Sequence, residues 1–435
     1  MHPVRSQAPQ PVPARTRCNT PSADVIIVGG GAAGLATAIF TRRRAPRLDV
    51  LVLDGARKLG AKILVSGGGR CNVTNRVVTP ADFSGGSRNV IKRVLAAFPA
   101  ERTVAFFREL GVDMYAEPDN GKLFPTTNSA KSVLGALLAE CERIGVRIRA
   151  DHRVTDIRRG PDGFSVTVGA SDFTATRVVL ATGGQSLPKT GSDGFGYTLA
   201  RRLGHTLVPL TPALDPLVLA GDFHPPLSGI SQTVELTVQA AGDRPHRVRG
   251  ILLWTHFGIS GPGVLDISRH WHRARAAERD VALTVNFLPG DDFVRAESRL
   301  IELGAAQPRL QLHNALARLL PARLADALLA ALAIAATTPM AHLSRDARRR
   351  LAHALIAWPL SVRSGRGYGF AEATAGGVPL GEVDARTLAS RPCPGLHLAG
   401  EILDVDGRIG GFNFQWAWSS AHVVAAALAD IPTPG

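Results

Sequence analysis

The chain has 435 residues, of which 45% are apolar and 20% charged, as in a globular protein with an ordinary core. Its length allows about three domains, or one large fold that carries an insertion. The net charge is +14, but arginine supplies 44 of the 50 basic residues and is spread along the whole chain. Such a diffuse positive field attracts small anionic ligands as well as nucleic acid, so the charge does not favour a nucleic-acid partner.

The N-terminal 22 residues are basic and rich in proline, with no acidic residue and no apolar run, so we expect a disordered tail rather than a secretory signal. Cys18, Cys71, Cys141 and Cys393 lie far apart, which argues against a disulfide framework, a zinc site and a redox dithiol. The longest uncharged apolar stretch, 327–341, contains a proline and is shorter than the roughly 18 residues that a membrane span needs. We therefore expect a cytoplasmic protein without a membrane span or a metal site.

The first predicted elements form a βαβ unit. "DVIIVG" at 24–29 is an apolar run with β-branched residues, typical of a buried parallel strand. "AAGLATAIFTRRR" follows with apolar residues at helical spacing, and "LDVLVLD" at 48–54 is a second buried strand. This order of elements is the start of a nucleotide-binding fold.

A dinucleotide-binding motif lies between the first strand and the helix. Gly29, Gly31 and Gly34 satisfy G-x-G-x-x-G, with Ala33 inside the motif. The glycines permit a tight turn, the approach of a pyrophosphate and close packing of helix on strand, while the helix N-terminus offers free N–H groups. Asp54 ends the next strand, where a carboxylate can accept hydrogen bonds from ribose hydroxyls. Together these features predict an ADP-containing dinucleotide.

Later strand-end loops favour FAD over NAD as that dinucleotide. A β-meander over 153–184 ends in a buried strand and two glycines, and another strand at 395–401 ends in a further loop. Loops spread along the chain fit a ligand that lies extended across several strand ends, as FAD does, whereas a nicotinamide domain ends within roughly 150 residues. Neither 191–196 nor 258–263 repeats the glycine spacing, so a separate NAD(P)H domain is not predicted.

The composition changes after about residue 205. Segments over 207–287 are short, β-rich and broken by proline and glycine, whereas 293–358 places leucines at helical spacing. Glycine-rich turns return from 366, before a last strand and a final helix that begins at 415. The predicted fold is α/β, with one nucleotide-binding domain interrupted by an insert. The predicted parts are a tail at 1–22, FAD-binding parts at 23–205 and 373–435, a β-rich insert at 206–290 and 359–372, and a helical insert subdomain at 291–358.

Five stretches carry a family resemblance: "GAKILVSGGGRCNVTN" (60–75), "LFPTT" (123–127), "THFGISGP" (255–262), "ATAGGV" (373–378) and "AGEILDVDGRIGGFNFQWAWSS" (399–420). They closely resemble the BaiN-like flavoproteins, also described as NAD(P)/FAD-dependent oxidoreductases or as the aminoacetone-oxidase family. The resemblance covers nearly all of residues 23–430. It implies a Rossmann-like FAD-binding domain of the glutathione-reductase type, interrupted by a β-barrel-like insert that carries a helical subdomain.

The resemblance places the glycine run at 67–69 beneath the flavin and the pyrophosphate, where bare backbone can present N–H groups to anionic oxygen. It implies that Lys62 and Arg70 offset phosphate charge, and that neighbouring polar side chains bind the ribitol or the ring edge. Cys71 is either a small packing residue or a thiol that works beside the flavin, and the first interpretation is favoured. The contacts implied in this segment are Lys62, Gly68, Arg70, Cys71, Asn72, Thr74 and Asn75.

The C-terminal motif implies contacts with the other end of FAD. Gly410, Gly411, Phe412 and Asn413 precede the final helix, and a helix N-terminus aimed at the isoalloxazine would stabilise negative charge near N1 and O2 of the reduced ring. The resemblance also implies that a strand-end loop lies over the ribitol and phosphate. The remaining predicted contacts are Val154, Ala181, Thr182, Gly183, Gly400 and Glu401.

The leading hypothesis is an FAD-dependent oxidoreductase that transfers a hydride to or from a small organic substrate, with NAD(P)H or oxygen as the second partner. Substrate is expected between the flavin domain and the insert, with 254–263 as one wall. His256 is an acid/base candidate by residue type only, and a structural role is favoured, so no catalytic residue is assigned. Two alternatives stay open, an FAD-dependent tRNA-modifying enzyme and a non-catalytic FAD-binding protein. The oligomeric state is open too.

Overall fold

The computed structural model describes residues 22–430, and a largely parallel sheet forms the centre of its first body. The strands run in the order β7, β2, β1, β10, and β10 also pairs with β20 and with the antiparallel hairpin of β9 and β8. Valine and isoleucine fill β1 and β2, as expected for strands that are covered on both faces. The bounds are β1 Ser22–Val28, β2 Val50–Leu53, β7 Arg147–Arg149, β8 Val154–Gly160, β9 Gly163–Val168, β10 Ser171–Leu180 and β20 Leu396–Leu398.

The register of this sheet aligns the carboxyl ends of four strands. Val28 pairs with Leu53 on one side and with Leu180 on the other, and Leu180 pairs with Leu398. Because these strands are parallel, the loops that follow them meet at one edge of the sheet. Ligands of open α/β sheets bind at such an edge.

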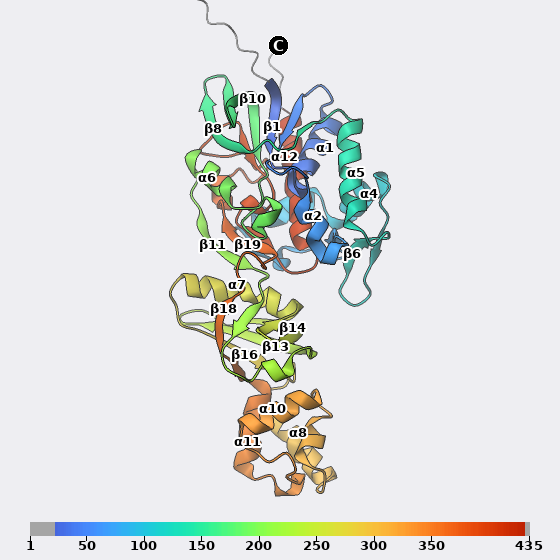
Figure 1. Cartoon of the computed structure of the whole chain (residues 1–435), viewed down its shortest axis with the longest axis vertical. Coiled ribbons are helices and arrows are strands. Elements are labelled where there is room, and N and C mark those ends of the chain that lie inside the picture. The colour runs from blue at the N-terminus through green and yellow to red at the C-terminus, as the bar shows by residue number, and fades with distance from the viewer. Residues whose placement is uncertain (1–21, 431–435) are drawn as a thin grey trace, which may run out of the picture.

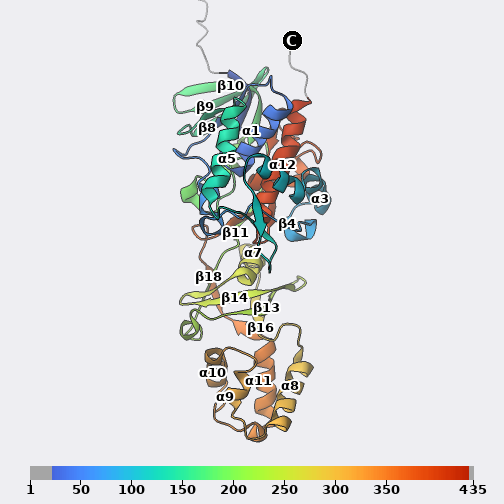
Figure 2. The ribbon, with the colours of Figure 1, turned by 90° about the vertical axis from the view of Figure 1, so that its right-hand side faces the viewer.

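Two helices that are buried on most sides pack together beside the sheet. In α1 (Ala32–Arg44) every residue from Ala33 to Thr41 is buried, and α12 (Phe412–Ala429) is buried on most sides. Figure 2 shows the two helices side by side, in agreement with their contacts. Fully buried side chains such as Leu35 contribute about 2 kcal/mol each. Helix α12 begins at Phe412, three residues before the predicted start, so the placement of Phe412 and Asn413 ahead of the helix is corrected.

Shorter elements complete the first body. Two small antiparallel sheets, β3–β6–β5 and β4–β21, lie near the start of α12. Their strands are β3 Thr74–Asn75, β4 Phe83–Gly85, β5 Met114–Ala116, β6 Lys122–Pro125 and β21 Val405–Gly407. The remaining helices here are α2 Ala61–Val65, α3 Arg88–Ala97, α4 Ala100–Glu109, α5 Ala130–Arg143 and α6 Phe195–Arg202.

An antiparallel sheet with its own core is inserted into this body. Its order is β17–β16–β13–β14–β15–β12–β18, and its first and last strands are consecutive in the chain, separated only by Ser361. The chain enters and leaves the insert through β11 (Val208–Ala213) and β19 (Ala373–Gly377), which pair with each other. The strands are β12 Leu217–Leu219, β13 Ser231–Ala240, β14 His246–Thr255, β15 Gly258–Ser260, β16 Val281–Asn286, β17 Trp358–Leu360 and β18 Val362–Gly365.

Helices extend the insert at both ends. Helix α7 (Pro262–Ala276) lies between the sheet and the first body, and a cluster of helices follows β16 at the far end (Figure 1). The prediction of short strands over 207–287 did not include α7, whose apolar positions are interrupted by arginine and histidine. The helical cluster predicted over 293–358 comprises α8 Phe293–Ala306, α9 Leu312–Leu316, α10 Ala322–Ala331 and α11 Arg345–Ile356.

Between residues 22 and 430 no helix combines the length and the apolar character that crossing a membrane requires. The predicted tail at 1–22 lies outside the described residues except for Ser22, which begins β1.

Candidate functional site

Four strand-end loops bring ten of the predicted site residues to one edge of the sheet. Gly29 follows β1, Asp54 follows β2, Ala181 follows β10, and Gly400 lies just beyond β20. A side chain on Gly400 would come 2.8 Å from Cβ of Ala33, so the last of these loops touches the start of α1. The predicted strand-end residues Ala33, Thr182, Gly183 and Glu401 lie on the same loops or directly beside them.

The three motif glycines differ in what surrounds them. A Cβ on Gly34 would lie 1.8 Å from the carbonyl oxygen of Gly29, and a Cβ on Gly29 would lie 2.5 Å from the oxygen of Ala181. Packing within the protein therefore requires these two glycines. A Cβ on Gly31 would meet no protein atom within 4 Å. Open space at the second glycine and at the uncapped N-terminus of α1 fits a phosphate.

The carboxylate of Asp54 is fixed by the backbone around it. Oδ2 accepts the N–H of Gly30 at 2.6 Å, and Oδ1 accepts the N–H of Ala56 at 2.7 Å. Each oxygen keeps a further lone pair, because a carboxylate offers about four acceptor positions. The group is partly exposed and oriented at the edge of the site, as a ribose ligand requires.

Lys62 and Glu401 form the centre of a polar network. The ammonium of Lys62 lies 2.7 Å from Oε2 of Glu401 and 2.5 Å from the hydroxyl of Ser186. Oε1 of Glu401 accepts the N–H of Thr374 at 2.8 Å. The network joins α2, the loop after β10, β19 and the loop after β20. The positive charge of Lys62 is thus balanced by Glu401, and its predicted contact with phosphate stays a prediction.

The glycine run adopts a backbone that few other residues tolerate. Gly67, Gly68 and Gly69 all have positive φ, at 56°, 68° and 86°. A Cβ on Gly68 would meet no protein atom within 4 Å, so this stretch presents bare backbone to open space. Cys71 is fully buried, and burial raises the pKa of its thiol to about 12. A neutral buried thiol fits the packing interpretation.

Arg70 points to a carboxylate and an aromatic ring. Its Nη1 lies 2.9 Å from Oε1 of Glu117, and its guanidinium carbon lies 4.0 Å from the ring centroid of Phe124. Hydrogen bonding to Glu117 raises the pKa of Arg70, and the pair stays partly exposed. Arg70 is therefore bound to the small sheet β3–β6–β5.

The polar side chains after the glycine run are bound to the start of α12. With its amide oriented to satisfy both ends, Asn72 accepts the N–H of Gly411 at 3.0 Å and donates to the oxygen of Thr74 at 2.9 Å. The hydroxyl of Thr74, fully buried, donates to Gln415 at 2.6 Å. Asn75 donates to the oxygen of Gly410 at 3.1 Å. These side chains determine how the glycine run and α12 lie together.

The N-terminus of α12 has no side-chain cap, so N–H groups of its first turn remain available. Gly410 and Gly411 have φ of 127° and 90°, and a Cβ on Gly411 would lie 2.5 Å from the backbone of Thr74. Phe412 is buried, and Asn413 exchanges hydrogen bonds with the backbone of Gly407. The glycines therefore allow this uncapped helix end to lie directly against the backbone of β3.

Val154 and Thr182, two further predicted contacts, lie in different surroundings. Val154 begins β8, and its side chain is buried in the core. The hydroxyl of Thr182 is buried and has no hydrogen-bond partner among residues 22–430. An unpartnered buried hydroxyl beside a strand-end loop fits a site that a bound ligand completes.

Three charged residues that the sequence analysis did not identify surround the start of α12. Oδ1 of Asp266, on α7, accepts the N–H of Ile409 at 2.7 Å, and a Cβ on Gly410 would lie 3.6 Å from Cε of Lys122. Desolvation raises the pKa of Glu372, while Lys122 and Lys62 oppose that rise. Desolvation raises the pKa of Asp266 as well. Both carboxyl groups therefore hold a proton more readily than an ordinary carboxyl group.

The only signal in the sequence for two of these residues is their position. Lys122 directly precedes the stretch 123–127, and Glu372 directly precedes the stretch 373–378, both of which carried the family resemblance. His256 is exposed and packs edge-on against Phe257, so it stays without an assigned role.

A buried arginine fixes the insert on the first body. Arg269, on α7, lies 2.5 Å from Oδ2 of Asp406 and donates to the backbone oxygens of Asp406 and Gly407. Both Arg269 and Asp406 are almost fully buried. The ion pair therefore holds α7 against β21, just before the start of α12.

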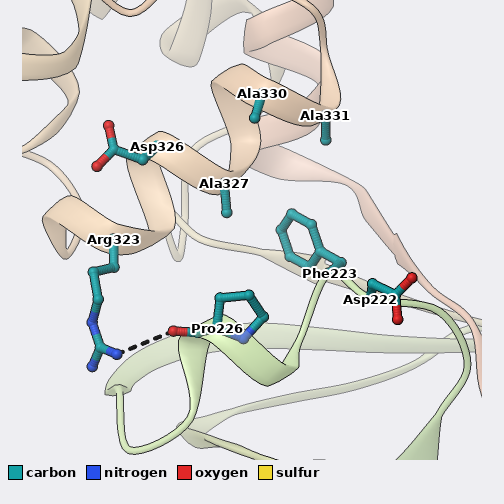
Figure 3. A pocket seen from close by; sticks show the side chains of 8 residues that line it. All are labelled: Asp222, Phe223, Pro226, Arg323, Asp326, Ala327, Ala330 and Ala331. Atoms are coloured by element: carbon teal, nitrogen blue, oxygen red, sulfur yellow. Dashed lines mark hydrogen bonds between the residues drawn. The ribbon is translucent and has the colours of Figure 1, made fainter.

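A hollow of about 620 Å³ lies elsewhere, between α10 and the segment that contains Phe223 (Figure 3). Three of its eight lining residues are alanines, and Arg323 donates to the oxygen of Pro226 at 3.1 Å. None of the predicted site residues lines it, so it carries no functional assignment. No group of three or more potential metal ligands occurs in the part of the chain that the structure describes.

Comparison with known proteins adds relatives along nearly the whole chain. The family model described as HI0933-like protein Rossmann domain matches residues 23–427. The chain is 35% identical to a ribosomal RNA dihydrouridine synthase of Escherichia coli, covering 93% of this chain and 98% of that protein. It is 33% identical to the ribosomal RNA dihydrouridine synthase of Haemophilus influenzae. It is 32% identical to a 3-dehydro-bile acid delta(4,6)-reductase of Clostridium scindens, covering 93% and 99%.

Among solved structures, a variant of the Escherichia coli quinol fumarate reductase subunit FrdA aligns with 94% of this chain and 70% of that chain, at a TM-score of 0.51 and 15% identity. The 3-ketosteroid delta1-dehydrogenase of Sterolibacterium denitrificans aligns with 94% and 100%, at 0.50 and 13%. At these identities the likeness concerns the fold alone: a Rossmann-like α/β body with an inserted antiparallel sheet.

Proposed function

Because the chain belongs to the HI0933-like Rossmann family, a family of flavin-dependent oxidoreductases, we propose that it holds FAD across the four strand-end loops and reduces a carbon–carbon double bond conjugated to a carbonyl group. Gly31, Asp54 and the bare backbone at Gly68 suit the pyrophosphate and ribose, and the uncapped N-terminus of α12 suits the isoalloxazine. When bound, FAD supplies a hydride that it has taken from NAD(P)H.

We propose that the substrate is a uracil base in ribosomal RNA. The observation that carries this proposal is that two relatives, 35% and 33% identical over 93% of this chain, are ribosomal RNA dihydrouridine synthases. Dihydrouridine forms when the C5–C6 double bond of uridine, conjugated to the C4 carbonyl, gains a hydride at C6 and a proton at C5. The net charge of +14 suits a polyanionic partner. The RNA alternative thus takes precedence over the small substrate first favoured.

Glu372 is the group that we propose for the proton. Its carboxyl makes no hydrogen bond to another described residue, it is accessible, and desolvation raises its pKa. In its protonated form this carboxyl group could donate a proton to C5 as the hydride reaches C6. Lys122 and Asp266, beside Ile409 and Gly410, would orient the carbonyl side of the substrate and keep the environment of Glu372 polar.

A small conjugated ketone is the second candidate substrate. The bile acid reductase at 32% identity favours it, because the name delta(4,6)-reductase describes reduction of ring double bonds in a 3-oxo compound. Both candidates present a double bond conjugated to a carbonyl, so the same hydride and proton positions serve either.

We also propose the predicted division into an FAD-binding part and an insert, and a cytoplasmic location. We regard the insert as barrel-like because the strands at the two ends of its sheet, β17 and β18, follow each other directly in the chain.

The purified FAD-loaded protein, supplied anaerobically with NADH or NADPH, tests the proposal. We expect ribosomal RNA that lacks dihydrouridine to gain it, seen by mass spectrometry as nucleosides about 2 Da heavier. Reduction of a steroid 4,6-dien-3-one without any change in RNA would favour the second candidate. Flavin that NAD(P)H reduces but that neither substrate re-oxidises would contradict both.

A further inference from the structure

An arginine and two phenylalanines form an exposed stack on the insert. The guanidinium carbon of Arg366 lies 3.4 Å from the ring centroid of Phe370 and 4.5 Å from that of Phe257. Phe370 is 50% exposed, an unusual state for so large an apolar side chain. Its ring is held in place by a cation rather than by a hydrophobic core.

The loop that carries this stack is fixed by the protein. The N–H of Gly367 donates to Oδ2 of Asp215 at 3.0 Å, and Nε2 of His272 lies 2.9 Å from the same oxygen. Asp215 is fully buried, and a Cβ on Gly365 would come 2.1 Å from that oxygen. These contacts fix the backbone of the loop in one position, whereas the side chains of Arg366 and Phe370 face solvent.

The same loop crosses from the insert to the first body. The N–H of Arg366 donates to the oxygen of Pro216 in the insert at 3.0 Å, whereas the oxygen of Tyr368 accepts from the N–H of Leu187, beyond β10, at 2.8 Å. Glu372 follows Phe370 by only two residues. Leu187 directly follows Ser186, whose hydroxyl binds Lys62, so this loop adjoins the polar network of the candidate site.

We propose that Phe257, Arg366 and Phe370 form a stacking platform for the RNA base next to the uracil that is reduced. Proteins that recognise unpaired RNA stack its bases on aromatic rings and on guanidinium planes, and enzymes that act on an extruded base contact its flanking nucleotides. The guanidinium also offers charge to the phosphate. This inference rests on the proposed function, and it adds the residues that hold the RNA.

The exposed cations around the loop favour RNA over an apolar ring system. Arg363 lies three residues before Arg366, and Lys189 lies two residues beyond Leu187, and both are exposed. A steroid would gain contact with the phenylalanine ring but nothing from these charges, whereas a nucleotide presents a planar base and a phosphate together.

Binding of the FAD-loaded protein to a uridine-containing ribosomal RNA hairpin, measured by fluorescence anisotropy at several salt concentrations, tests the platform. We expect F370A to bind about tenfold more weakly with an unchanged salt slope, because it removes stacking but no charge. R366M should weaken binding and reduce the salt slope by about one ion. F370W should restore binding. V294A, which removes another exposed apolar side chain on α8, is the matched control.

Three outcomes decide the matter. F370A that binds RNA within twofold of the unaltered protein would overturn the platform and leave the proposed function intact. An equal loss for a small conjugated ketone would assign the stack to small planar molecules and overturn its role in RNA binding. If the unaltered protein neither binds nor reduces the hairpin, the proposed RNA substrate fails, and the platform fails with it. Flavin content and reduction by NAD(P)H should be unchanged in every variant.

Discussion

The ammonium group of Lys62 lies 2.7 Å from Oε2 of Glu401, although 339 positions separate the two residues in the chain. K62M should leave the partly buried carboxylate without its partner, which costs about 1–3 kcal/mol, and should lower both the melting temperature and the flavin content of the purified protein. Thermal unfolding and flavin absorbance measure the two effects. K58M, a change at an exposed lysine of the same segment, is the control. Unchanged flavin content in K62M would contradict the importance of this ion pair.

The motif glycines allow cofactor binding and folding to be separated. We expect G31A to fold with an unchanged melting temperature in the flavin-free form, because its methyl group meets no protein atom within 4 Å, and to lose at least about tenfold in FAD affinity as the methyl group occupies space for phosphate. G34A should instead destabilise the protein by about 1–3 kcal/mol, since its Cβ would lie 1.8 Å from the oxygen of Gly29. If G31A binds FAD with unaltered affinity, the phosphate does not lie at this position.

Activity should fall as pH rises if Glu372 supplies the proton. The pKa of its carboxyl is raised, chiefly by desolvation, so the acid form persists above the ordinary range near 4.3 and is lost as pH rises through the raised value. We expect E372Q to reduce the rate of substrate reduction by about 100-fold and to abolish that limb of the pH profile. Reduction of the flavin by NAD(P)H, followed by stopped-flow absorbance, should remain unaffected. An E372Q enzyme with an unaltered profile would exclude Glu372 as the donor.

The thiol of Cys71 should be inert. Burial raises its pKa to about 12, so the thiolate is scarce at neutral pH. The stability that the buried, protonated thiol contributes to the fold is lost only as pH rises toward that value. We expect C71A to keep turnover within about twofold, and a thiol reagent at pH 8 to modify Cys71 only after denaturation, as peptide mass spectrometry would detect. Rapid modification of the native protein, or a C71A enzyme with normal flavin and no turnover, would support a thiol that acts beside the flavin.

The buried pair Arg269–Asp406 should be important for stability. R269M removes the close partner of the fully buried carboxylate of Asp406 and leaves it only the longer contact to Arg273, which costs up to about 3–5 kcal/mol. Chemical denaturation should show this loss, and the double variant R269M/D406N should recover part of it. R273M, which removes a longer contact of 3.5 Å to the same carboxylate, is expected to cost less. Equal stability of R269M and the unaltered protein would mean that the insert is held by other contacts.

The parts of the fold that could be predicted from the sequence depend on local patterns. The β-branched run of β1 and the glycine motif before α1 specify a buried strand, a turn and a helix without reference to distant residues. The family resemblance is confirmed by the match over residues 23–427. Helix α7 was missed because arginine and histidine interrupt its apolar positions, and Arg269 becomes buried only through its contacts with β21.

The missed parts of the candidate site depend on distant contacts. Lys122, Asp266 and Glu372 come from β6, α7 and the segment before β19, and no spacing within the sequence connects them. For Asn72 and Thr74 the residue types were recognised, but their partners were not, because the start of α12 lies more than 300 positions away. The hydrogen bonds that these side chains make within the protein could not be predicted from the sequence, and their contacts with FAD stay predictions.

The chain crosses between the first body and the insert along two strands, β11 and β19, that pair with each other. Such a paired crossing resists twisting more than two independent linkers would, and the ion pair at Arg269 adds a third attachment. Wide opening and closing of the two bodies would have to break these contacts. We therefore expect access to the flavin to be governed by the fit of the incoming molecule to a preformed passage, with turnover limited by docking and departure more than by a hinged lid.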